Sequence, residues 1–121
     1  MTASRWNSWP SFASQKYFEE LMEGHSRVRE VTKLSPSRWD LTLTDGTLIR
    51  IFITDVYTFS ASDYALLRAA HPDVQCIVSA SGWNHFSTQA QEDATADGIP
   101  TVHLGAELMS AVHGFLQDRR T

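Results

Sequence analysis

The residues best suited to chemistry lie in one stretch, Ser79–His85, which joins an apolar run to a predicted helix. Asn84 and His85 can hydrogen-bond a ligand, and Trp83 can stack on a base or anchor a partner. Ligands of open α/β sheets bind outside the carboxyl ends of the strands, where this stretch is expected to lie. Serine and asparagine near a helix start also act as N-caps, so capping the helix and forming the turn before it is the alternative role.

Motifs for covalent hydrolysis and for zinc binding are missing from the sequence. No Gly-x-Ser-x-Gly segment is present, so hydrolysis through Ser79 or Ser81 has no support. The five histidines lack the His-Glu-x-x-His spacing of a metal-binding helix. The single cysteine, Cys76, lies in an apolar run and excludes an internal disulfide and a Cys-rich zinc site.

The length of 121 residues predicts one domain. Ten Lys and Arg against fourteen Asp and Glu give a net charge of -4, which argues against general coating of nucleic acid. A local basic patch remains open, with solvated strand faces as the alternative; its candidates are Arg27, Arg29, Arg38 and Arg50. No apolar run is long enough to span a membrane, and the N-terminus lacks the apolar region of a signal peptide. We therefore expect no membrane association and a cytoplasmic location.

The elements expected in the N-terminal half are a helix and three strands. Residues 1–10, with Trp6 and Trp9, are interpreted as an arm on the body of the domain. Apolar residues at helical spacing predict a helix over 11–23. Strands are predicted at 27–34, 39–43 and 48–53, and Asp45-Gly46 predicts a hairpin turn between the last two.

The C-terminal half alternates helices and strands. Ser60 and Asp63 have the spacing of a capping box, which starts a helix that ends at His71-Pro72. A buried strand is expected at 74–79, followed by a helix that carries Phe86, Ala90 and Ala94 and ends at Gly98. A short strand at 99–102 and a final helix that closes on Arg119-Arg120 complete the chain. This order predicts a single α/β domain over 11–121, in which an antiparallel meander and two crossover strands form a mixed sheet flanked by helices.

This order of elements is similar to the restriction-endonuclease-like core, the PD-(D/E)xK nuclease fold. The stretch Cys76–Leu108 resembles the end of the Mrr-type restriction endonuclease domain. There a buried strand leads to a Phe-Ser/Thr pair, a helix with two alanines four residues apart, a Gly-Ile pair and a leucine on the last helix. The matching residues here are Phe86-Ser87, Ala90, Ala94, Gly98-Ile99 and Leu108.

The resemblance implies a Mg²⁺ site built from one aspartate and a Glu/Asp-x-Lys triplet, where the acids hold the cation and the lysine assists the attacking water. Asp40 is the candidate for the first acid, and the triplet corresponds to Ile53-Thr54-Asp55. Its first residue is apolar and its last is acidic, and no lysine follows Lys33. The catalytic motif is therefore degenerate.

Two functions follow from these observations. The first is a non-catalytic relative of these nucleases, without a cofactor, that binds a protein or nucleic-acid partner in regulation, immunity or defence. The second is a divergent Mg²⁺-dependent nuclease in which Asp40 and Asp55 share the metal and Arg50 replaces the lysine. Asp40 and Asp55 can instead be strand-end residues that meet solvent or cap turns. A homodimer through a sheet edge or a tryptophan surface is a further possibility.

Overall fold

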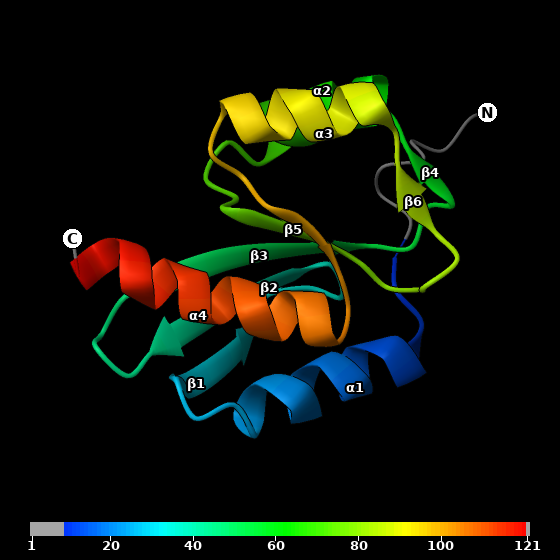
Figure 1. Cartoon of the computed structure of the whole chain (residues 1–121). Coiled ribbons are helices and arrows are strands. Elements are labelled where there is room, and N and C mark those ends of the chain that lie inside the picture. The colour runs from blue at the N-terminus through cyan, green and yellow to red at the C-terminus, as the bar shows by residue number, and fades with distance from the viewer. Residues whose placement is uncertain (1–8, 121) are drawn as a thin grey trace.

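The described part of the chain has the order of helices and strands that the sequence predicts, with two additional two-residue strands at Thr58–Phe59 and His85–Phe86. The computed structural model describes residues 9–120, with side chains described as far as Phe115 (Figure 1). The helices are α1 (Phe12–Glu23), α2 (Ala61–Ala70), α3 (Thr88–Ala96) and α4 (Ala106–Arg120). The strands are β1 (Val28–Lys33), β2 (Arg38–Leu43), β3 (Leu48–Thr54), β4 (Thr58–Phe59), β5 (Cys76–Ser79), β6 (His85–Phe86) and β7 (Thr101–His103).

Five of the strands form one mixed sheet in the order β1-β2-β3-β5-β7. The first three pair antiparallel, and β5 and β7 continue the sheet parallel to β3. Gly46 adopts a φ of 91° in the β2–β3 turn, a conformation that glycine reaches without a Cβ clash. The predicted meander with two crossover strands is thus confirmed, in a single small α/β domain.

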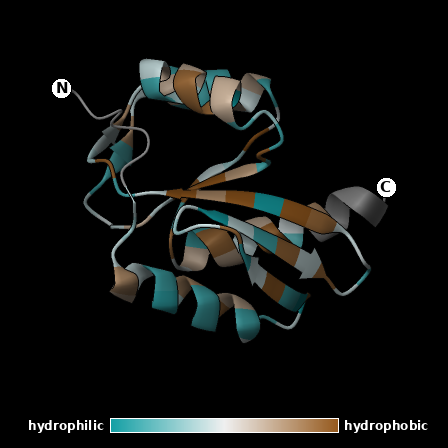
Figure 2. Ribbon diagram, turned by 180° about the vertical axis from the view of Figure 1, so that it is seen from behind, coloured by the Kyte–Doolittle hydropathy of each residue, from teal (hydrophilic) through white to brown (hydrophobic). Residues whose placement is uncertain are grey.

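The helices cover both faces of this sheet (Figure 1). Phe18 of α1 and Val112 of α4 pack with Ile53 in the core on one face. On the other face, Leu67 of α2 packs in a second core that includes Phe52. Figure 2 shows the hydrophobic residues of the central strands between the two helical layers. Because consecutive residues of β3 serve opposite cores, this strand is buried along most of its length.

Side-chain caps define where the helices begin. Ser11 accepts a hydrogen bond from the backbone N–H of Ser14 at the start of α1. Ser60 and Asp63 form the predicted capping box of α2, in which each side chain accepts from the backbone N–H of the other residue. These contacts satisfy N–H groups that have no partner within the helix.

The predicted start of the third helix at Phe86 is wrong. Phe86 lies in β6, which pairs with β4 as a separate two-stranded parallel sheet. The helix begins at Thr88 because Ser87 is its N-cap, with an extended backbone and a side chain that accepts from the N–H of Ala90. Phe86 still packs in the core with Ala90, so its apolar spacing reflects shared burial rather than a shared helix.

The N-terminal arm falls mostly outside the described residues, including Trp6. Trp9 is exposed, and the carbonyl of Pro10 accepts a hydrogen bond from the Gln15 amide of α1. Among the described residues, none of the helices has the length and apolar character needed to cross a membrane.

Candidate functional site

Three parallel strands end side by side, and their last residues form a polar row. Thr54 of β3 pairs in register with Ser79 of β5, which pairs with His103 of β7. Side chains alternate between the two faces of a strand. Thr54 and Ser79 therefore lie on the same face as Phe52 and Ile77, the face covered by α2 and α3. The carboxyl ends of the parallel strands thus present polar groups, as expected for a ligand site of an α/β sheet.

The loop after β5 folds back onto the end of β3 through Asp55. The Asn84 amide donates to Asp55 Oδ1 at 3.0 Å, and the Ser81 hydroxyl donates to the same oxygen at 3.2 Å. Asn84 is only 4% exposed, so its hydrogen bond compensates for the burial of a polar side chain. Asp55 is thus a partly buried residue at the end of β3 that anchors this loop through its carboxylate.

His103 ties the same loop to α4. Its ring Nε2 donates to the carbonyl oxygen of Asn84 at 2.7 Å, and its Nδ1 lies 3.3 Å from Glu107 Oε1. The same Glu107 oxygen accepts the backbone N–H of His103 at 2.8 Å. A continuous polar network therefore holds this loop in place. Its members are Asp55, Ser81, Asn84, His103 and Glu107.

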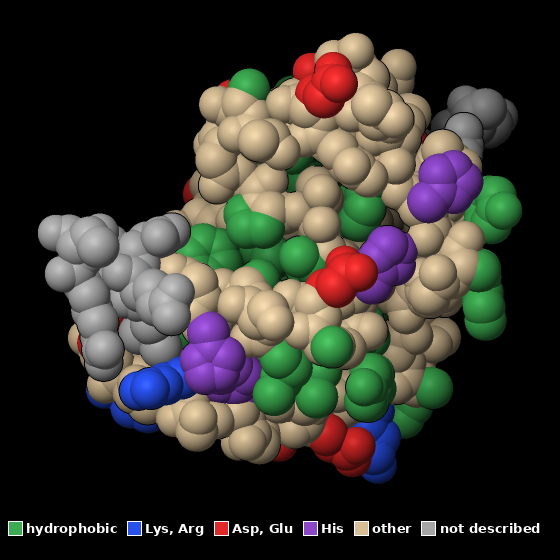
Figure 3. All heavy atoms as spheres, in the orientation of Figure 1, with side chains coloured by type: hydrophobic (Ala, Val, Ile, Leu, Met, Phe, Trp, Pro, Cys, Tyr) green, Lys and Arg blue, Asp and Glu red, His purple; other side chains and the backbone are tan. Residues whose placement is uncertain are grey.

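The same loop carries Trp83, which is 77% exposed to solvent. Tyr57, 62% exposed, lies at the entry to β4, and its ring meets the His85 ring edge-on at a centroid distance of 5.3 Å. His85 Nε2 also lies 3.2 Å from the Thr58 hydroxyl. We call Tyr57, Trp83 and His85 the aromatic rim. Figure 3 shows hydrophobic and histidine side chains along the edge of the molecule that carries β4 and β6.

Lys and Arg are absent from the segments that build the aromatic rim. The sequence has no Lys or Arg from residue 51 to 67 or from residue 69 to 118. Contacts to nucleic-acid phosphates depend mainly on these two residue types. The segments that build the rim therefore offer no Lys or Arg side chain to a phosphate group.

Arg50 lies near the opposite end of β3, away from the rim. Its Nε is 3.2 Å from Asp73 Oδ2, and Arg38 reaches the same carboxylate at 3.3 Å. Partial burial raises the pKa of Asp73. The charge and hydrogen bonds of Arg38 outweigh this effect, and the charge of Arg50 adds to them, so the pKa of Asp73 lies below its usual value. Arg38 also lies 3.9 Å from Asp40. These four residues form a compensated ion-pair cluster rather than a basic patch.

Asp40 and Asp55 are not brought together. Asp40 pairs in register with Arg50, five residues before Asp55, and five strand residues span roughly 16 Å. In the part of the chain that the structure describes, no cluster of three or more His, Cys, Asp or Glu could hold a metal ion. The two carboxylates therefore serve different local networks.

The register of the hairpin also identifies the residue that faces the degenerate triplet. The backbone N–H of Ile53 donates to the carbonyl of Ser37 at 2.7 Å, so Ser37 rather than Asp40 lies opposite Ile53. Ser37 is 2% exposed and Ile53 is completely buried. Ile53 belongs to the core that α1 and α4 cover.

Sequence reasoning identified Trp83, Asn84 and His85 but missed three residues of this region. Tyr57, His103 and Glu107 carry no motif, and only the position of His103 at the end of a predicted strand offered a signal. The stretch Ser79–His85 does not cap α3, since Ser87 does, but it forms the turn that the same interpretation expected, with the Asn84 N–H donating to the Ser81 carbonyl at 3.1 Å. Comparison with protein-family models, with curated proteins and with solved structures finds no match for this chain.

Proposed function

We propose that this chain is a non-catalytic binding module, built on a restriction-endonuclease-like core, that recognises a partner protein through the aromatic rim. The observed order of elements, with a meander followed by two parallel strands, agrees with what the resemblance to the Mrr-type domain implies. A regulatory or defence-associated setting follows from that resemblance.

One observation carries the non-catalytic part of the proposal. Ile53 occupies the first position of the triplet and is completely buried against α1 and α4. Ser37 lies opposite it and is buried as well. A hard cation such as Mg²⁺ needs several oxygen ligands and keeps bound water. A position filled by a packed isoleucine side chain offers neither.

The recognition part of the proposal rests on the aromatic rim and the polar network beneath it. Exposed aromatic residues provide large contact areas, and they are enriched in protein interfaces. Asp55, Asn84 and His103 hold the loop in one conformation, so little conformational entropy is lost when Trp83 is buried by a partner. The absence of Lys and Arg from these segments favours a protein over a nucleic acid.

A cleavage and metal titration tests the non-catalytic part. Purified protein is incubated with plasmid DNA and with RNA in Mg²⁺ or Mn²⁺, and its melting temperature is followed as Mn²⁺ is added. We expect no cleavage and no rise in melting temperature, because a metal that binds the folded state would stabilise it. Metal-dependent cleavage that Asp40→Ala or Asp55→Asn abolishes would instead establish the divergent nuclease.

Quantitative affinity capture tests the recognition part. Wild type is compared with Trp83→Ser and with Leu66→Ser, which alters an exposed hydrophobic residue on α2 away from the rim. We expect a specific protein to be retained by wild type and Leu66→Ser and lost by Trp83→Ser, and the purified pair to reproduce this difference by calorimetry. Equal retention by the two variants refutes recognition through the rim. Tight binding of labelled DNA or RNA that depends on Trp83 would identify a nucleic-acid partner instead.

A further inference from the structure

The ring of His103 faces two hydrogen-bond acceptors, one at each of its nitrogen atoms. Nε2 lies 2.7 Å from the carbonyl oxygen of Asn84, and Nδ1 lies 3.3 Å from Oε1 of Glu107. Neither a carbonyl oxygen nor an ionised carboxylate has a proton to donate. Both contacts are therefore hydrogen bonds only when both ring nitrogens of His103 carry a proton.

Each neutral form of the ring satisfies only one of these contacts. A neutral imidazole has one N–H and one nitrogen with a free lone pair. With the proton on Nε2, the lone pair of Nδ1 faces the carboxylate of Glu107. With the proton on Nδ1, the lone pair of Nε2 faces the carbonyl oxygen of Asn84. The site thus fits the charged imidazolium better than either neutral tautomer.

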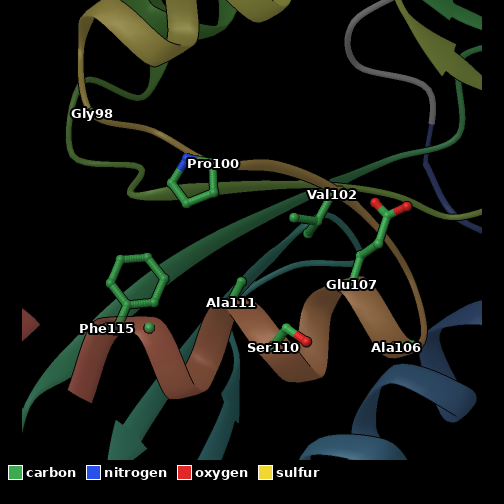
Figure 4. Close-up of a pocket in the computed structure, with 9 residues that line it drawn as sticks. Gly98, Pro100, Val102, Ala106, Glu107, Ser110, Ala111 and Phe115 are labelled. Atoms are coloured by element: carbon green, nitrogen blue, oxygen red, sulfur yellow. The ribbon is translucent and has the colours of Figure 1, made fainter. Parts of the chain in front are cut away.

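The carboxylate of Glu107 is held beside the ring by contacts that do not involve the ring. Its Oε1 accepts the backbone N–H of His103 at 2.8 Å. Glu107 also lies in the first turn of α4, where a negative charge is favoured by the helix dipole. Figure 4 shows Glu107 on α4 beside Val102, the neighbour of His103 on β7. The carboxylate therefore remains beside the ring after the ring loses its proton.

The groups around the ring come from several segments of the chain. They are Ser79 of β5, Asn84 of the loop, Phe86 of β6 and Glu107 of α4. A second carboxylate, that of Asp55, is linked to the ring through Asn84. The nearby His85 directs its own ring to Tyr57 and Thr58. Since the sequence has no Lys or Arg from residue 69 to 118, the strand, loop and helix that surround His103 supply no such cation to oppose its charge.

His25 has the opposite arrangement of partners. Its Nδ1 accepts the backbone N–H of Arg27 at 3.0 Å, and its Nε2 lies 3.3 Å from the carbonyl of Met109. One donor and one acceptor match a neutral ring, whereas a second ring N–H would face the N–H of Arg27. Acid should therefore act in opposite directions on the regions around His25 and His103.

We propose that protonation of His103 controls the order of the loop that carries Trp83. The charged ring holds the carbonyl of Asn84 and the carboxylate of Glu107 together, and the neutral ring holds only one of them. Histidine changes its charge between about pH 5 and pH 8, so the loop is more ordered in mild acid and less ordered as the pH rises. His103 is thus a positioning residue for the rim.

The consequence for recognition rests on the proposed function of the aromatic rim. An ordered loop loses less conformational entropy when a partner buries Trp83. Binding through the rim should therefore be tighter in mild acid than in mild alkali.

NMR spectroscopy of the protein alone tests the control of the loop, so its result does not depend on whether the rim binds a protein. Long-range ¹H–¹⁵N spectra report the protons on the two ring nitrogens of His103. Amide exchange of Asn84 and His85 reports the order of the loop, since their N–H groups donate to Ser81 and Tyr57. We expect two ring protons at about pH 5.5 and one at about pH 8. Protection of the two amides, corrected for intrinsic exchange rates, should be about three- to fivefold higher at the lower pH, the effect of a partly exposed ion pair.

The amide of Ile77 is the control within the same sample. It donates to the carbonyl of Pro100 inside the main sheet and is remote from the loop in the chain. Its protection should not rise in acid, because His25 is satisfied only by a neutral ring. A rise at all amides together would report a general change in stability and would contradict a local effect of His103.

Two variants assign the effect to the contact between His103 and Glu107. Glu107→Gln keeps an oxygen that can accept the His103 N–H and removes the negative charge, so loop protection should become nearly equal at the two pH values. His113→Gln, at an exposed histidine of α4, is the matched control and should keep the wild-type ratio. Equal protection at both pH values in wild type, a single ring proton on His103 at the lower pH, or an unchanged ratio in Glu107→Gln overturns the proposal.

The outcomes also separate this inference from the proposed function. A loop that becomes ordered in acid, combined with equal partner capture by Trp83→Ser and Leu66→Ser, would refute recognition through the rim and leave the role of His103 intact. Capture that depends on Trp83, combined with a loop that does not respond to pH, would do the reverse.

Discussion

At the scale of single residues, His25 shows how a buried polar side chain is committed to one protonation state. It is 2% exposed, its Nδ1 accepts the backbone N–H of Arg27, and its Nε2 donates to the Met109 carbonyl. The His113 ring lies 4.7 Å away. Burial lowers the pKa of His25. This effect outweighs the hydrogen bond to Met109, which raises the pKa because it favours the charged ring. The charges of His113 and Arg27 lower the pKa of His25 further.

The stability of the protein should therefore fall as the solution becomes acidic. Burial and the charge of Arg38 lower the pKa of His71 in the same direction. A group whose pKa is lower in the folded chain binds more protons after unfolding, so its contribution to stability is lost as pH falls below the unfolded value of 6.5. Urea titrations between about pH 7 and pH 5 should show a decreasing free energy of unfolding.

Substitution of His25 isolates its part of this effect. His25→Gln should reduce the dependence of stability on pH, and the control His85→Gln, at an exposed position, should retain it. An unchanged pH dependence in His25→Gln would show that other groups govern the acid response.

The buried amide of Asn84 is expected to contribute to both stability and loop order. Asn84→Ala removes a hydrogen bond to Asp55 and leaves Ser81 as its remaining partner in the loop. We expect a loss of about 1–3 kcal/mol in the free energy of unfolding, since a partly buried carboxylate loses a donor. Urea denaturation measures this loss. Gln89→Ala, which breaks an exposed hydrogen bond to Asp93 on α3, should cost much less.

At the scale of elements, the capping box sets the start of α2. Ser60→Ala removes the acceptor for the Asp63 N–H and should destabilise the protein by about 1 kcal/mol. Chemical denaturation measures the change. The neighbouring Ser62 is exposed and does not cap, so Ser62→Ala is the matched control and should be close to neutral. Equal costs for the two variants would mean that the capping box adds nothing beyond helix propensity.

Several elements follow from signals within four or five residues of one another. Asp45-Gly46 predicted the β2–β3 turn, and Gly98 ends α3 with a φ of 74°. The β4–β6 pair was not predicted, because each of the two strands has only two residues and their pairing brings together segments that are far apart in the chain. Phe86 resembled a helical residue because it packs in the same core as Ala90 and Ala94.

At the scale of the whole molecule, two cores share one sheet, so the domain should unfold cooperatively. Cys76 lies on a central strand in the core covered by α1 and α4. Its complete burial raises the pKa of the thiol to about 12, which keeps it protonated and unreactive. The thiol should react with an exposed-thiol reagent only after both helical layers separate from the sheet.

Thiol labelling of Cys76 therefore measures the opening of the whole domain. The opening free energy from labelling rates should equal the free energy of unfolding from urea titration. A much lower opening free energy from labelling would reveal a local opening of β5 in place of cooperative unfolding.

The sequence alone determined the types and order of most elements, the apolar strand at Cys76 and the loss of the Glu-x-Lys pattern. These features depend on local backbone preference, side-chain caps and residue identity. The tertiary structure alone decided that Ser37 lies opposite Ile53 and that Asp40 and Asp55 lie apart. It also decided that His103 joins the polar network that holds the Trp83 loop. Those relations depend on strand register and on the packing of distant segments, which no short stretch of sequence encodes.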